Sequence, residues 1–283
     1  MLISTYRRLE NGILERCLRN YIRNNGYGDR FNVHICDDGT NGVFSKYTFQ
    51  MMNSICFDAG VKDFRLHVSR QNQGVGATRS MLIKEAMKYC HKDDLLFCLD
   101  DDVYLQKNAI KNMVKALDRE PSCGIMGVIG SLRNFCHHKT KDGKTVSYGQ
   151  LRKPVECGVF GVAYGIRAVL PMRDNVNFSR EMRARADAKL EVEACLAGWK
   201  CMVNPLSDAT HVRSIKNHVG AGSGNGGLSE LTQKRWLEYG KLIVDRYPEV
   251  CSMDKLNRLH YLRKIKKMRE TGEIVLKDIR RIK

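Results

Sequence analysis

Residues 95–103 read LLFCLDDDV, so an apolar run passes directly into three consecutive aspartates in a 283-residue chain with a net charge of +17. A short apolar run bounded by polar residues is typical of a buried strand. Asp100 and Asp102 lie two positions apart, a spacing that places both side chains on the same side of an extended segment. The stretch therefore predicts a buried strand that presents paired carboxylates at its carboxyl end.

Strands and helices alternate on both sides of this stretch. We expect strands at residues 2–5, 31–36, 64–68, 95–99 and 124–129, with helical periodicity between them. This order indicates an α/β fold, with a mostly parallel central sheet and helices on both faces. Because ligands of such sheets bind beyond the carboxyl ends of the strands, three polar segments are expected to converge on one crevice. They are Tyr6-Arg7-Arg8, Asp37-Asp38-Gly39-Thr40 and Asp100-Asp101-Asp102.

The pattern changes after residue 130. We expect a first half at 1–130, a second half at 131–230 that contains a strand at 157–164, and a basic helical tail at 231–283. Residues 217–229, NHVGAGSGNGGLS, are too rich in glycine to form a core of their own. Such a segment suits a mobile lid, and it would equally suit an inert connector.

The positive charge is concentrated in two segments. Residues 254–283 hold 11 Lys and Arg against 4 Asp and Glu, and a second basic stretch lies at 133–153. Such an excess indicates a polyanionic partner, either nucleic acid or an anionic membrane surface, although solubility alone would also account for it. Because no apolar run reaches the roughly 18–20 residues of a membrane span and no signal peptide opens the chain, we expect a cytoplasmic protein.

The eleven cysteines are scattered and form no CxxC pair, which is typical of buried thiols in a reducing compartment. Cys136-His137-His138 would suit part of a zinc site, but a second pair of ligands at zinc-finger spacing is missing from the sequence. The glycine-rich residues 72–76 lack the Lys-Ser/Thr of a P-loop, and no GxSxG elbow occurs. These patterns argue against a zinc finger, a P-loop nucleotidase and an α/β-hydrolase.

The paired aspartates favour a metal site. Two carboxylates held together repel each other, and a hard divalent cation relieves that repulsion. Mg²⁺ and Mn²⁺ prefer oxygen ligands and often share them with substrate phosphates. Asp100 and Asp102 therefore suit a cation next to a phosphate group, although an acidic turn that caps a helix would have the same sequence.

Three segments together resemble family 2 glycosyltransferases, which have the GT-A (Rossmann-like) fold. They are VHICDDGTNG at 33–42, RQNQGVGATRSMLI at 70–83 and LLFCLDDDV at 95–103, in the order and spacing of that family. The resemblance covers residues 1–130 and reappears at 158–170 and 187–200. It implies an enzyme that moves a sugar, with inversion, from a nucleoside diphosphate sugar (commonly a UDP-sugar) to an acceptor hydroxyl, with Mn²⁺ or Mg²⁺ as cofactor.

The resemblance assigns the nucleotide-sugar site to the first half. Thr5 and Arg7 fall on the first-strand segment that lines the nucleotide pocket in the family. Asp37 and Asp38 match the turn whose carboxylate holds the base. Arg79 stands where the family has an arginine near the nucleotide.

The same resemblance assigns the metal and the diphosphate. Asp100 and Asp102 match the D-x-D that binds both, and Asp101 between them is placed on the nucleotide sugar. Several GT-A enzymes add a late histidine as a metal ligand, and His211 is the candidate here, with His218 as the second choice. A lone histidine is equally able to serve a structural role.

An inverting transferase also needs a base that deprotonates the acceptor hydroxyl. The family places it at a helix start, in a Glu-Asp pair, and the matching residues are Ala186-Asp187. Asp187 is therefore the assigned base, although alanine replaces the usual glutamate. Glu191 and Asp174 stay open as alternatives, and Asp187 would also suit a helix N-cap.

The acceptor is inferred from charge alone. The basic excess favours DNA, and some bacteriophages add sugars to hydroxymethylated DNA bases, which would have to leave the helix to react. The alternatives are a surface polysaccharide or lipid-linked acceptor, and a non-catalytic nucleic-acid-binding module. An anionic membrane fits less well because Tyr261 is the only Phe, Trp or Tyr in residues 254–283. For DNA of a virus the location would be the host cytoplasm, and no obligate protein partner is inferred.

Overall fold

The computed structural model describes residues 1–6, 12–25, 31–39, 46–61, 63–129, 137–139, 145–147, 150–156, 159, 162–182, 186–212, 238 and 240–246. The chain divides into two compact units, Met1–Arg213 and Ser214–Lys283. In the second unit, residues 238 and 240–246 are helical, and residues 217–229 and the basic tail lie outside the described residues. The three-part division at residues 130 and 230 stays a prediction.

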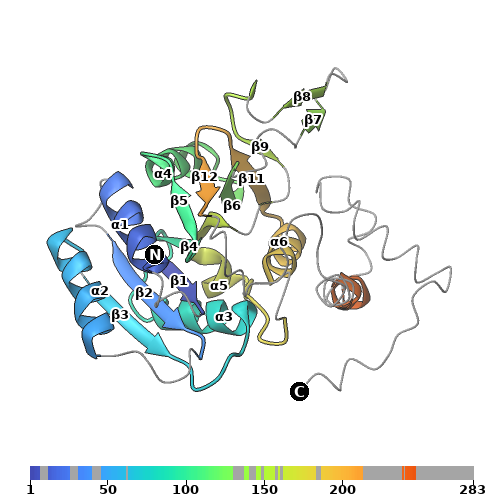
Figure 1. Cartoon of the computed structure of the whole chain (residues 1–283). Helices are drawn as coiled ribbons and strands as arrows, with labels where there is room; N and C mark the ends of the chain where they lie inside the picture. The colour runs from blue at the N-terminus through green and yellow to red at the C-terminus, as the bar shows by residue number, and fades with distance from the viewer. Residues whose placement is uncertain are drawn as a thin grey trace, which may run out of the picture. The chain divides into compact units, whose positions relative to one another are not determined.

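An eight-stranded sheet forms the centre of the first unit (Figure 1). In spatial order its strands are β3 (Asp63–Val68), β2 (Asn32–Asp37), β1 (Leu2–Thr5), β4 (Leu95–Asp100), β10 (Ala163–Arg167), β6 (Cys123–Val128), β11 (Lys200–Asn204) and β9 (Val155–Glu156). The first four strands along the chain pair in parallel, and so do β6 and β11. The expected α/β fold with a mostly parallel central sheet is confirmed.

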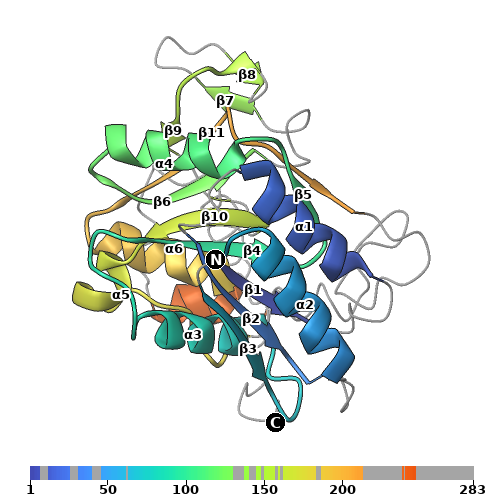
Figure 2. The same cartoon turned by 90° about the vertical axis from the view of Figure 1, so that its left-hand side faces the viewer.

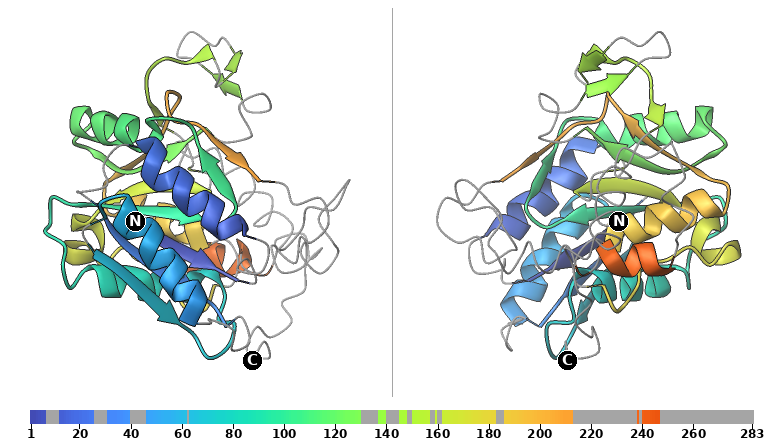
Figure 3. Two further views of the ribbon diagram at one scale, coloured as in Figure 1. Left: turned by 60° about the vertical axis from the view of Figure 1, so that its left-hand side comes forward. Right: turned by 90° about the vertical axis from the view of Figure 1, so that its right-hand side faces the viewer.

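Helices cover both faces of the sheet. On one face α1 (Ile13–Asn25) contacts α2 (Lys46–Asp58) and α4 (Ala109–Arg119), as Figure 2 shows. The opposite face carries α3 (Val75–Ala86), α5 (Val169–Arg173) and α6 (Ala186–Leu196), and the two views of Figure 3 show each layer in turn. Helix α4 buries an apolar stripe that consists of Ala109, Ile110, Met113, Ala116 and Leu117. No helix among these described segments is long and apolar enough to cross a bilayer.

Strand β10 differs from the expectation of a strand at 157–164. It begins at Ala163 and pairs antiparallel with both β4 and β6, and residues 157, 158, 160 and 161 lie outside the described residues. A Cβ at Gly165 would lie 2.9 Å from the Phe97 ring, so glycine allows β10 to approach β4 closely. The insertion of β10 places Tyr164 beside Cys98, two residues before the aspartates.

Two small antiparallel sheets accompany the main one. β5 (Val103–Leu105) pairs with β12 (Ala209–His211), and β7 (His137–Lys139) pairs with β8 (Thr145–Ser147). Because β5 starts directly after Asp102, its pairing with β12 brings the end of the first unit back to the aspartates. The backbone N–H of Val212 donates to the Asp102 carbonyl at 2.7 Å.

Candidate active site

The carboxyl ends of β1, β2 and β4 meet at one edge of the sheet. In the register of the parallel strands, Thr5 stands opposite Asp37, and Ser4 stands opposite Asp100. The two expected polar segments after β2 and β4 thus lie beside the end of β1, where ligands of open α/β sheets bind. Arg7 and Arg8 lie outside the described residues.

Asp38 joins the loop after β2 to the start of α3. Its Oδ1 and Oδ2 accept the backbone N–H groups of Gln73 and Gly74, each at 2.8 Å. Asp38 is 4% exposed, so these bonds compensate for removing the carboxylate from water. Gly39 has φ +81°, and a Cβ there would lie 2.3 Å from the Gln71 carbonyl carbon, so the two loops are in direct contact.

The three aspartates after β4 have different surroundings. The Asp100 side chain is 29% exposed, and its backbone carbonyl accepts a hydrogen bond from the Tyr21 hydroxyl. The Thr5 hydroxyl donates to Oδ2 of Asp101 at 2.6 Å, which ties the end of β1 to the aspartate run. Asp102 is buried, 8% exposed. The three adjacent aspartates therefore differ in their exposure and in their contacts.

Arg79 occupies the space behind Asp100. Its Nη2 lies 2.5 Å from Asp100 Oδ1, and its Nη1 donates to the Tyr164 hydroxyl at 3.0 Å. Burial by itself would lower the pKa of the guanidinium, but Tyr164, Asp100 and Asp187 outweigh it, and the pKa is raised above its ordinary value. Arg79 is 4% exposed and is held as a buried cation beside the aspartates.

Asp187 lies in the first turn of α6, where the helix dipole favours a carboxylate. The start of α3 lies close to the start of α6. A Cβ added at Gly76 would lie 2.2 Å from the Met182 carbonyl oxygen and 3.2 Å from the Ala186 Cβ, so glycine permits this close approach. Asp187 is close enough to act electrostatically on both Arg79 and Tyr164. The structure therefore gathers Asp187, Arg79 and Asp100 around Tyr164.

The two alternative bases have other contacts. The Asp174 carboxylate accepts hydrogen bonds from Arg173 at 2.7 and 3.0 Å and from the Trp199 indole at 2.6 Å. Arg173 and then Trp199 hold the pKa of the Asp174 carboxyl below its usual range. Glu191 is buried in α6, 3% exposed. Asp174 thus links α5 to the turn after α6, away from the start of α6 where Asp187 lies.

The donor set suits a hard divalent cation. Asp100 and Asp102 offer carboxylate oxygens, the ligand type that Mg²⁺ and Mn²⁺ prefer. Strand pairing sets His211 opposite Val103, so its backbone lies beside Asp102; the His211 side chain and all of His218 fall outside the described part. Within the part of the chain that the structure describes, no three His, Cys, Asp or Glu side chains form a ready metal site. Cys136 also lies outside that part, as do the His137 and His138 side chains.

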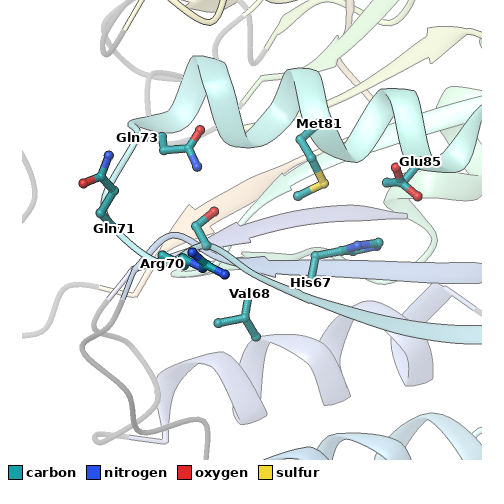
Figure 4. Close-up of a pocket in the computed structure, with 8 residues that line it drawn as sticks. His67, Val68, Arg70, Gln71, Gln73, Met81 and Glu85 are labelled. Carbon is teal, nitrogen blue, oxygen red and sulfur yellow. The ribbon is translucent and has the colours of Figure 1, made fainter.

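A cavity of about 720 Å³ opens at the end of β3, next to the loop that Asp38 holds. Arg70, Gln71 and Gln73 line it from the loop, and His67 and Glu85 line it from β3 and α3, as Figure 4 shows. These side chains offer a cation, two amides and a carboxylate to a polar ligand. Sequence reasoning missed this cavity, because its walls come from separate elements, an edge strand and a helix.

Tyr164 was also missed by sequence reasoning. The segment around it, Ala163-Tyr164-Gly165-Ile166, has the apolar character of any buried strand. The hydroxyl acquires a role only because β10 is inserted next to β4, and Arg79 lies 85 residues earlier in the chain. The one signal in the sequence was a hydroxyl-bearing side chain within an otherwise apolar strand.

The family model described as Glycosyl transferase family 2 matches residues 1–172. No curated protein sequence matches the chain. Among the solved structures that share its fold are three of low sequence identity. S. aureus TarS (residues 1–349) is 14% identical, with a TM-score of 0.59 over 93% of this chain and 68% of that chain. The mannosyltransferase PcManGT from Pyrobaculum calidifontis, solved with GDP-Man and Mn²⁺, is 12% identical, with a TM-score of 0.61 over 94% and 68%. GalNAc-T7, solved with UDP, GalNAc and Mn²⁺, is 13% identical, with a TM-score of 0.58 over 96% and 54%.

Proposed function

Because the chain belongs to glycosyl transferase family 2 and is a nucleotide-sugar glycosyltransferase of the GT-A fold, we propose that it uses a divalent cation and Asp187 to move a sugar from a UDP-sugar to an acceptor hydroxyl. The observation that carries this proposal is the meeting of Thr5, Asp37 and Asp100 at the carboxyl ends of three adjacent parallel strands. That edge is where open α/β sheets bind nucleotides. Relatives of the same fold have been solved with UDP, with UDP-GlcNAc and with GDP-Man.

The nucleotide would lie along this edge. Asp37, which is 1% exposed, would present its carboxylate to the base. Asp38 fixes the neighbouring loop and keeps lone pairs for a further donor. Thr5 and Asp101, which share a hydrogen bond, would line the ribose and sugar side. Arg7, whose structure is outside the described residues, completes the proposed contacts.

Asp100 and Asp102, with His211, would hold Mn²⁺ or Mg²⁺ next to the diphosphate. A bound cation would neutralise part of the charge that develops on the departing diphosphate. Two structures of the same fold have been solved with Mn²⁺. Arg79 adds a second positive charge behind Asp100, so the site carries both carboxylates and a buried cation.

Asp187 would take the proton from the acceptor hydroxyl as the new bond forms. Its place in the first turn of α6 favours the ionised carboxylate that a base requires. Asp174 is held by Arg173 and Trp199, which makes it the weaker choice. Attack from the side opposite the diphosphate would invert the configuration of the sugar.

For the acceptor we propose a hydroxymethylated base in DNA, on the observation that the chain carries a net charge of +17. A surface polysaccharide or a lipid-linked sugar is the alternative. Membership of an enzyme family favours both over a non-catalytic nucleic-acid-binding module. The assay is transfer of label from the donor to duplex DNA with 5-hydroxymethylcytosine, to unmodified duplex and to a polysaccharide. Label on the polysaccharide alone would overturn the DNA proposal.

A thermal-shift screen of nucleotide sugars tests the donor half. The melting temperature should rise with one nucleotide class, and only when Mn²⁺ or Mg²⁺ is present, because ligands that bind the folded state stabilise it. Asp102→Ala should lose the metal-dependent part of the shift. Asp93→Ala, which removes an aspartate with a 77% exposed side chain, should keep it. The proposal is wrong if no nucleotide sugar shifts the melting temperature with either metal.

A further inference from the structure

Tyr164 is a buried phenol with a charged partner. It lies in the middle of β10, between Cys98 of β4 and Gly127 of β6, and it is 1% exposed. A buried hydroxyl needs a hydrogen-bond partner, and Arg79 Nη1 supplies one at 3.0 Å. Packing alone would be satisfied by phenylalanine, so the hydroxyl calls for an explanation of its own.

The guanidinium of Arg79 connects Tyr164 to Asp100. One terminal nitrogen donates to the Tyr164 hydroxyl and the other to Asp100 Oδ1 at 2.5 Å. Because the guanidinium is a planar, rigid fork, fixing one end fixes the direction of the other. The Phe178 ring adds a wall, with its centroid 5.7 Å from the Arg79 Cζ. Tyr164 of β10 and Asp100 of β4 are thus joined through a single side chain.

Asp187 approaches the same pair from α6, close enough to act on both Arg79 and Tyr164. The proposed metal end of the site, at Asp100, and the proposed base, at Asp187, thus border one buried unit. A shift of the Arg79 side chain would change the field at both carboxylates.

We propose that Tyr164 is a positioning residue: through Arg79 it holds the Asp100 carboxylate in the orientation that binds the cation and the diphosphate. The inference rests on the proposed function, because it assigns Asp100 to the donor site. Tyr164 itself touches neither ligand. Groups one step removed from a metal typically change its affinity by about 10- to 100-fold when they are lost.

Tyr164→Phe isolates the hydroxyl, because the ring and its packing remain. Mn²⁺ binding in the presence of UDP, followed by electron paramagnetic resonance, should weaken by about tenfold. Ser207→Ala is the control, because it removes another buried hydroxyl, which is 0% exposed. The Ser207 hydroxyl donates to the carbonyl of Ala109, in α4, at 2.8 Å. That variant should bind Mn²⁺ and UDP as the wild type does. Equal Mn²⁺ affinity in Tyr164→Phe and the wild type, at a temperature where both are folded, overturns the proposal.

A double-mutant cycle tests the route through Arg79. If Tyr164 acts only by holding Arg79, then adding Tyr164→Phe to Arg79→Lys should weaken Mn²⁺ binding little beyond Arg79→Lys alone. Additive losses in the double variant would contradict the route.

The outcomes also separate the two proposals. A wild type that binds neither UDP nor GDP with Mn²⁺ overturns the proposed function and this inference with it. A wild type that binds, with a variant that binds equally well, overturns the role of Tyr164 alone.

Discussion

Nη2 of Arg79 lies 2.5 Å from Oδ1 of Asp100, so a buried guanidinium of α3 stands directly behind the first aspartate of the run. The Arg79 side chain is 5% exposed and that of Asp100 29% exposed. Removing one partner of such a pair leaves the other charge partly desolvated, which costs more than the loss of an exposed pair. Loss of this pair should therefore affect both the stability of the fold and the carboxylate of the proposed donor site.

Arg79→Met keeps most of the side-chain length and removes the charge. We expect the free energy of unfolding in urea to fall by about 2–3 kcal/mol, below the roughly 3–5 kcal/mol of a fully buried pair because Asp100 is partly hydrated. Arg19→Met breaks the surface pair with Glu15, whose side chains are 37% and 32% exposed, and should cost under about 1 kcal/mol. Equal losses in the two variants would show that the buried pair stabilises the fold no more than the exposed pair does.

Asp38 and Asp37 are neighbours with different contacts. Asp38→Asn should loosen the start of α3, because an amide presents one acceptor oxygen where the carboxylate presents two to Gln73 and Gly74. Hydrogen exchange at those two backbone amides should accelerate, with a loss of about 1–3 kcal/mol in stability. Asp37→Asn is the matched change: we expect weaker UDP binding and unchanged exchange at Gln73 and Gly74. The assignment fails if Asp38→Asn leaves that exchange unaltered.

His34 should make stability depend on pH. Burial, followed by the amino terminus, His67 and Arg65, lowers the pKa of His34 from 6.5 to about 4. The folded state holds neutral His34, so between pH 6.5 and 4 the unfolded chain binds more protons. Stability is therefore lost as the pH falls through that window, by up to roughly 3 kcal/mol.

His34→Gln should flatten this part of the profile when unfolding in urea is followed from pH 7 to pH 4. The ring of His67 stacks on His34 with centroids 5.6 Å apart, and burial lowers the pKa of His67 too, so some slope will remain. His91→Gln is the control, because the His91 side chain is 71% exposed. A profile as steep in His34→Gln as in the wild type would contradict the assignment.

The sequence predicted the parallel half of the fold because its signals are local. Each strand there is a short apolar run closed by a turn, and β1 to β4 follow one another at the spacing of β-α-β units. Parallel pairing then brings the strand ends together whatever the details of the loops. For this reason the polar segments that begin at Asp37 and Asp100 could be expected from the sequence alone to lie at one edge, beside the end of β1.

The remaining contacts depend on strand order and could not be read in this way. β10 enters the sheet antiparallel between β4 and β6, and only that insertion puts Tyr164 within reach of Arg79. Likewise, the sequence places Asp38 in an acidic turn that would bind a base. In the structure its carboxylate oxygens accept hydrogen bonds from the backbone amides of Gln73 and Gly74, which lie 35 and 36 residues later. Apolar periodicity records which face of an element is buried, and it does not record which distant side chain lies against it.

Asp187 and Asp174 give the sharpest test of the proposed chemistry. Asp187→Asn removes the base and retains the shape of the side chain, so sugar transfer should fall by about 10²- to 10⁴-fold. Binding of UDP with Mn²⁺, measured by calorimetry, should stay within threefold of the wild type, because Asp187 is assigned to the acceptor step.

Asp174→Asn should show the reverse pattern. It weakens the contacts with Arg173 and Trp199 that tie α5 to the turn after α6, so the melting temperature should fall while the rate per folded molecule stays near the wild-type value. The Asp174 pKa is held below its usual range by those partners, so this carboxylate accepts a proton less readily than an unpaired aspartate would. If transfer collapses in Asp174→Asn and survives in Asp187→Asn, the base must be reassigned to α5, and Arg79 would then neighbour a carboxylate with no part in proton transfer.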